Sequence, residues 1–137
     1  MAAAGALVIT GCESRAATSK ESSTRDVVKA PSADQRRVAR VIERLDDAVN
    51  RGDARAVCHK LVARESAGKR CVPDLVLLFR QPHYRTFDIT VRKVTVRGRR
   101  ATAKVVLRVR RSSGGERETY SLAKEDGEWR LRLSLGR

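Results

Sequence analysis

The chain contains few side chains that could perform chemistry, and its three cysteines are the most informative of them. Cys12 follows an uncharged, apolar stretch, and its thiol is a candidate for covalent modification because thiols are strong, soft nucleophiles near neutral pH. The two histidines, His59 and His83, form no evident pair with a nucleophile or a carboxylate. We therefore find no chemistry in the sequence that would make the protein an enzyme.

The residues that lead to Cys12, Ile9-Thr10-Gly11-Cys12, resemble the lipobox of bacterial lipoproteins. The resemblance implies that residues 1–11 are a signal segment that is removed, and that Cys12 becomes a first residue joined to a diacylglycerol. Two acyl chains would then hold the protein on the outside of the cell membrane. No Lys or Arg precedes the apolar run, so the alternatives are a true start upstream of Met1 or an Ala-rich N-terminus with an incidental cysteine. A transmembrane helix is not expected, because spanning requires about 20 apolar residues.

If Cys12 carries lipid, Cys58 and Cys71 remain as a pair. An even number of cysteines in an exported domain predicts a disulfide, which would stabilise the fold by about 3 kcal/mol. Two free, buried thiols are the alternative. We predict no metal and no cofactor, because Cys58 and His59 point in different directions on a helix and two ligands are too few.

The net charge is +14, from 30 Lys and Arg against 16 Asp and Glu. Arg outnumbers Lys by 23 to 7, a bias typical of a GC-rich genome, so part of this charge reflects codon usage. The remaining charge favours anionic partners such as lipid headgroups or cell-wall polymers. Nucleic acid is not expected, because aromatic residues make up 4% of the chain and do not alternate with basic ones.

Residues 12–31 are rich in Ser, Thr, Ala and charge, which predicts a flexible tether before a domain at 32–137. Ser32–Gln35 fits a capping box that opens an amphipathic helix, and Gly52 ends it. Asp53 can cap a second helix whose inner face includes Cys58. A short helical segment is expected at Leu75–Phe79.

From residue 87 the apolar period becomes two, which predicts a meander of four antiparallel strands. A change of phase near Arg92-Lys93 predicts a β-bulge, and Asp126-Gly127 predicts a hairpin turn. Tyr120 and Trp129 are candidates for the mouth of an apolar pocket between the first helix and the sheet. The alternative is that Trp129 fills the core.

The other face of the sheet is predicted to be basic. By alternation it carries Arg92, Lys104, Arg108, Arg110, Arg130 and Arg132. Residues 85–137 hold fifteen basic and six acidic residues, so this part contributes +9 of the net charge. Such a face could lie against anionic headgroups, and the alternative is a solvated, Arg-biased exterior.

The order of helices followed by a long, bulged antiparallel sheet resembles the NTF2-like (SnoaL-like) cone fold. The chain also resembles small exported proteins of high-GC Gram-positive bacteria, in motifs that are Asn50-Arg51-Gly52-Asp53, Ala56–Leu61, Cys71 and Lys124–Leu131. This resemblance covers Ser32 to Leu135 and implies an α+β domain, with N-terminal helices packed on a curved four-stranded antiparallel sheet. It says little about function, because the fold hosts enzymes, binding modules and scaffolds.

Enzymes of this superfamily use an Asp or His that projects into the cone, and none of the inward positions we assign holds either residue. We therefore expect a lipid-anchored, extracytoplasmic, non-catalytic binding or accessory module, with a ligand or protein partner that the sequence does not identify. Two alternatives stay open. One is a module that binds anionic lipid or cell-wall polyanions through the basic sheet face, and the other is an enzyme whose acid/base group is His59, His83 or Asp88.

Overall fold

The computed structural model describes residues 30–82, 87–109 and 114–133. The predicted lipobox and nearly all of the predicted tether lie outside these ranges. The chain divides into the units Met1–Ala30 and Pro31–Arg137. Its elements are α2 (Ala33–Arg51), α3 (Ala54–Ala56), a π-helical turn η1 (Val57–Leu61), α4 (Cys71–Phe79), β1 (Phe87–Arg97), β2 (Arg100–Val109), β3 (Gly115–Glu125) and β4 (Glu128–Arg132). This is the predicted α+β order.

The capping box that begins α2 is confirmed. The Ser32 hydroxyl accepts a hydrogen bond from the Gln35 backbone N–H at 3.1 Å, and Gln35 Oε1 accepts one from the Ser32 N–H at 2.7 Å. These two bonds satisfy N–H groups that have no partner within the helix. The helix ends at Gly52, which adopts a left-handed conformation with φ 67°, as a C-terminal cap requires.

The second predicted helix is shorter than expected. Asp53 caps it, since its carboxylate accepts from the Ala56 N–H at 3.0 Å, but α3 gives way to η1 after Ala56. The chain then leaves the helical conformation at Val62, which pairs with Leu131 of β4 in a parallel bridge. The next residue, Ala63, donates its N–H to the Leu131 carbonyl at 2.7 Å. The helix ends here because the backbone of Val62 and Ala63 is used at the edge of the sheet.

The sheet is the predicted meander, with strand order β1-β2-β3-β4 and antiparallel pairing throughout. The pairing of β1 with β2 shifts register between Val91 and Lys93, which is where the bulge was predicted. Asp126 and Gly127 both have positive φ, at 49° and 80°, as a tight β3–β4 hairpin requires.

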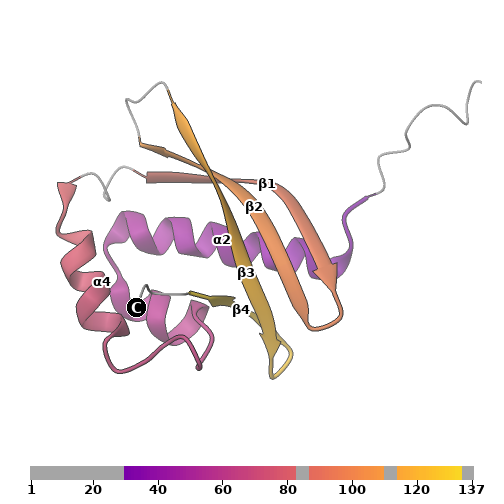
Figure 1. Ribbon diagram of the computed structural model, residues 1–137, viewed down its shortest axis with the longest axis horizontal. Helices are drawn as coiled ribbons and strands as arrows, with labels where there is room; N and C mark the ends of the chain where they lie inside the picture. The colour runs from indigo at the N-terminus through magenta and orange to yellow at the C-terminus, as the bar shows by residue number, and fades with distance from the viewer. Residues whose placement is uncertain (1–29, 83–86, 110–113, 134–137) are drawn as a thin grey trace, which may run out of the picture. The chain divides into compact units, whose positions relative to one another are not determined.

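Helix α2 covers one face of this sheet, with α4 at one end (Figure 1). We call this the inner face, and the opposite side the outer face. Two side chains of α2 also bond to the edge strand β1: Asp46 accepts from the Ile89 N–H at 2.9 Å, and Gln35 donates to the Val94 carbonyl at 3.1 Å. These bonds use backbone groups of the edge strand, so β1 is less able to pair with a strand of another chain.

The core lies between the inner face and the helices. Its largest fully buried side chains are Ile42, Leu122, Leu131, Val38, Val57, Val62, Val105 and Cys71. Packing is looser toward α4, where Ile89, Leu107 and Tyr120 are only half-buried. Within the described ranges, no helix is both long enough and apolar enough to cross a bilayer.

Candidate functional site

A pocket of ≈ 300 Å³ opens at the loosely packed end of the core. We call it the cone pocket. Three helical elements and the inner face of the sheet contribute its apolar lining, which is Leu45, Val49, Val57, Leu75, Leu78, Phe79, Ile89, Leu107, Tyr120 and Leu133. A concave, mainly apolar site with a few polar groups is typical of small-molecule binding.

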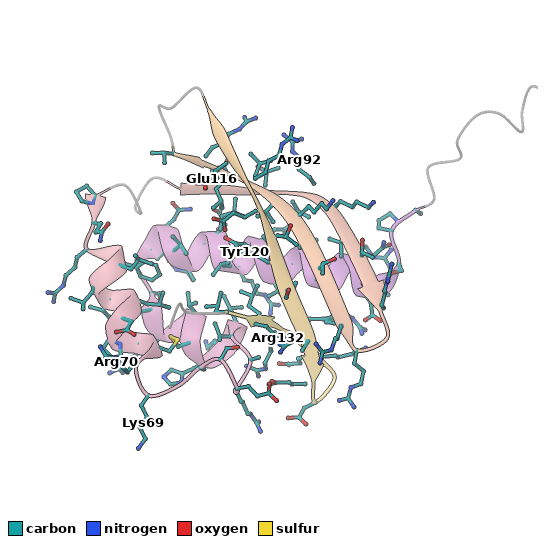
Figure 2. All side chains as sticks on the ribbon, viewed as in Figure 1. Lys69, Arg70, Arg92, Glu116, Tyr120 and Arg132 are labelled. Carbon is teal, nitrogen blue, oxygen red and sulfur yellow. A yellow bond between two sulfur atoms is a disulfide. The ribbon has the colours of Figure 1, made fainter. Side chains whose placement is uncertain are left out.

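The charged groups of the cone pocket are two carboxylates, Glu116 and Glu118. They precede Tyr120 at alternate positions of β3, so the pleat places all three on the inner face. Glu116 and Tyr120 can be followed along this strand in Figure 2. Neither glutamate was among the candidate residues predicted from the sequence. Strict alternation back from Leu122 would have found them.

The structure separates the two aromatic residues that were predicted at the pocket mouth. Tyr120 lines the cone pocket, but Trp129 does not. Trp129 is buried in the core, and its indole N–H donates to Asp34 Oδ1 at 3.1 Å. Lys124 completes this cluster, with its Nζ 3.3 Å from the same oxygen and 5.6 Å from the centre of the indole ring. Trp129 is drawn toward the first turn of α2 because a buried indole N–H requires an acceptor.

The Trp129 hydrogen bond, together with the nearby charges of Lys124 and Arg37, lowers the pKa of Asp34 below the ordinary value of 3.8. A lowered pKa means that the ionised carboxylate stabilises the fold at neutral pH, and that this stabilisation is lost as the pH falls through the folded-state pKa. We expect Asp34→Asn to destabilise the protein at pH 7, and the difference from wild type to shrink below about pH 4. Denaturant unfolding followed by Trp129 fluorescence measures this, with Asp47→Asn on the same helix as the control. A difference that stays constant down to acidic pH would contradict the role of Asp34.

The proposed acid/base groups do not meet in the cone pocket. His59 is exposed on η1, and Asp88 is exposed on the outer face of β1, where its Cα partner is Arg108. His83 lies outside the described residues. In the part of the chain that the structure describes, no group of three or more His, Cys, Asp or Glu side chains is placed to hold a metal ion.

The predicted disulfide is present. Cys58 of η1 and Cys71 at the start of α4 are joined, both buried, with their Cα atoms 6.0 Å apart. The bond ties η1 to α4, and both elements line the cone pocket. Cys12 lies outside the described residues.

The predicted basic face is divided by the structure. Arg92, Lys104 and Arg108 border one hollow of ≈ 620 Å³, together with Arg117, which the sequence analysis did not select. Arg130 is instead committed to the fold, since it donates to the His59 and Lys60 carbonyls at 3.2 Å and lies within 4.0 Å of Glu125 and Glu128. Arg132 is exposed on β4 and does not border the hollow, and Arg110 lies outside the described residues.

Comparison with solved structures shows that this is an NTF2-like fold. A Campylobacter jejuni protein described as a candidate NTF2-like transpeptidase superposes with a TM-score of 0.52 at 16% identity, covering 75% of this chain and 100% of that one. An NTF2-type protein carrying five substitutions gives 0.51 at 14%, covering 68% and 90%. An NTF2-like protein of unknown function from Mesorhizobium loti gives 0.43 at 17%, covering 76% and 98%.

At such low identities the likeness establishes the fold and no activity. No protein-family model and no curated protein matches the chain.

Proposed function

We propose that the protein is a lipid-anchored, extracytoplasmic binding module that takes a small, mainly apolar ligand in the cone pocket without chemically changing it. The observation that carries this proposal is the pocket itself, with ten apolar or aromatic side chains and two carboxylates around ≈ 300 Å³. The proposal of an exported, lipidated protein is supported by the sequence around Cys12 and by the Cys58–Cys71 disulfide, which is typical of oxidising compartments.

The pocket lining suggests the chemical class of the ligand. Apolar side chains from the helices and from the sheet would enclose a hydrocarbon body. Glu116 and Glu118 are exposed, and among the described residues neither has a salt bridge. They favour a head group that is cationic or that donates hydrogen bonds. A short alkyl chain that ends in an amine combines both properties.

Binding can be tested with three probes that share a tail and differ in the head group: octylamine, octanol and octanoate. We expect octylamine to bind most tightly in calorimetric titrations and octanoate least. Glu116→Gln combined with Glu118→Gln should weaken octylamine binding by about threefold to tenfold, because exposed ion pairs contribute up to about 1 kcal/mol each. Octanol binding should not change.

A matched pair of substitutions locates the site. Leu107→Trp fills the cone pocket and should reduce binding of all three probes at least tenfold, as expected when a cavity is occupied. Leu77→Trp makes the same replacement on α4 at a side chain that is 61% exposed and does not line the pocket, so binding should persist. If none of the probes saturates, or if Leu107→Trp binds as well as Leu77→Trp, the pocket is not the binding site.

A further inference from the structure

We propose that the hollow on the outer face of the sheet docks onto the anionic phospholipid headgroups of a membrane. Its cations come from three adjacent strands: Arg92 from β1, Lys104 and Arg108 from β2, and Arg117 from β3. Figure 2 shows Arg92 projecting from the sheet on the side away from α2. We call these four residues the basic quartet. The cone pocket opens on the inner face, and the two sites share Glu118 at their border.

No side chain of the basic quartet forms an ion pair with a described residue. All six ion pairs among the described residues use other cations, and no hydrogen bond from a quartet side chain to a described residue is found. Glu118 is the one acidic residue that borders the hollow, so the lining carries a net +3. Asp88 lies opposite Arg108 on β1, and Lys93 opposite Lys104 offsets it. Because like charges on neighbouring strands repel each other, an anion bound among them would be stabilising.

The position of Arg108 is set by packing against β3. Arg108 pairs across the sheet with Gly115, and a Cβ atom at position 115 would lie 2.6 Å from Val106 Cγ1 and 3.3 Å from Arg108 Cγ. Any residue larger than glycine would therefore displace both side chains. Glycine lets Arg108 lie close over the β3 backbone, on the strand that carries Arg117. The position of Arg108 within the quartet therefore depends on local packing in the sheet, and the overall net charge of the chain does not explain it alone.

A membrane fits this surface in chemistry and in location. Phosphate oxygens of headgroups pair well with guanidinium groups, and the half-buried Val106 adds apolar surface between the cations. If Cys12 is lipidated, as the proposed function holds, a tether of about 20 residues has a typical span of about 25 Å, which keeps the domain near the bilayer. Juxtamembrane cations are attracted to anionic leaflets.

The test uses the full-length chain with Cys12→Ser, so that binding reports the sheet face and not an acyl anchor. Sedimentation with vesicles of phosphatidylcholine alone is compared with an equal mixture of phosphatidylcholine and phosphatidylglycerol. We expect binding only to the anionic vesicles, and weaker binding as salt rises. Converting the basic quartet to Gln (Arg92→Gln, Lys104→Gln, Arg108→Gln, Arg117→Gln) should weaken it by about 1,000-fold.

A control set removes the same charge from the helices: Arg40→Gln, Arg44→Gln, Arg55→Gln and Lys60→Gln, all of them exposed. It should weaken binding by less than about threefold, because at physiological salt charges act over about 8 Å. Circular dichroism checks that each variant is folded. If the quartet variant does not fold, the pairs Arg92→Gln with Lys104→Gln and Arg108→Gln with Arg117→Gln replace it, each with an expected loss of about 30-fold.

Three outcomes would overturn the proposal. The first is equal loss of binding in the quartet and control variants, which would show that only net charge matters. The second is no preference for the anionic vesicles. The third is quartet-dependent binding to soluble polyphosphate without binding to vesicles, which would assign the hollow to a soluble polyanion. None of these outcomes affects the octylamine titration of the cone pocket, so failure here is distinguishable from failure of the proposed function.

Discussion

Cys12→Ser is expected to move the protein from the membrane fraction to the soluble fraction of a bacterial host. Ser offers no thiol for attachment of a diacylglycerol, so both acyl chains would be lost. One myristoyl chain alone gives a membrane partition constant of about 10⁴ M⁻¹, and a second makes anchoring stable, so their joint loss should release nearly all of the protein. Cell fractionation measures the release, and intact mass spectrometry detects the acyl groups on Cys12.

Two controls sharpen this experiment. Ser14→Ala lies just beyond the lipobox and should leave the protein in the membrane fraction. A wash in about 1 M salt separates the anchor from the basic quartet, because charge attraction is screened at that ionic strength while acyl insertion persists. Wild-type protein that is soluble and unmodified would disprove the lipid anchor. It would leave the fold and the cone pocket unaffected.

Replacing both Cys58 and Cys71 with Ala is expected to lower the free energy of unfolding by about 3 kcal/mol. The crosslink joins residues 13 apart in sequence and limits the freedom of the unfolded chain. Each replacement also removes a buried sulfur atom, which adds a packing loss. Because α4 supplies Leu75, Leu78 and Phe79 to the cone pocket, we also expect weaker octylamine binding in this variant.

Urea denaturation with and without reductant separates the two causes. Reduced wild type loses the crosslink but keeps the sulfur atoms, so it should fall most of the way toward the double variant. Reductant should not change the double variant itself. If wild-type stability were insensitive to reductant under conditions that reduce accessible disulfides, the crosslink would not stabilise the fold.

Local features of this fold were predictable because short-range patterns determine them. The capping box at Ser32 needs only two side chains one turn apart, and the bulge near Arg92-Lys93 follows from a change of phase in one strand. Asp126-Gly127 defines a hairpin without reference to the rest of the chain. Where long-range packing competed with the local pattern, prediction failed. Sequence reasoning did not show that the second helix becomes π-helical over Val57–Leu61 and ends there, where Val62 and Ala63 become backbone partners of Leu131.

The candidate sites were only partly predictable, for the same reason. Alternation placed Arg92, Lys104 and Arg108 on the outer face but could not show that Arg130 reaches the carbonyls at the end of η1. Nor could it show that Gly115 makes room for Arg108, since that depends on strand register.

Periodicity and composition were enough to predict the order of the elements, the apolar face of each strand and the cysteine pair, because local patterns encode these directly. The grouping of the outward cations around one hollow, and the choice of the aromatic residue that lines the cone pocket, follow from long-range packing. Tyr120 lines that pocket, while Trp129 packs in the core and donates to Asp34. Such choices depend on contacts between residues far apart in sequence, and a single sequence carries no local signal for them.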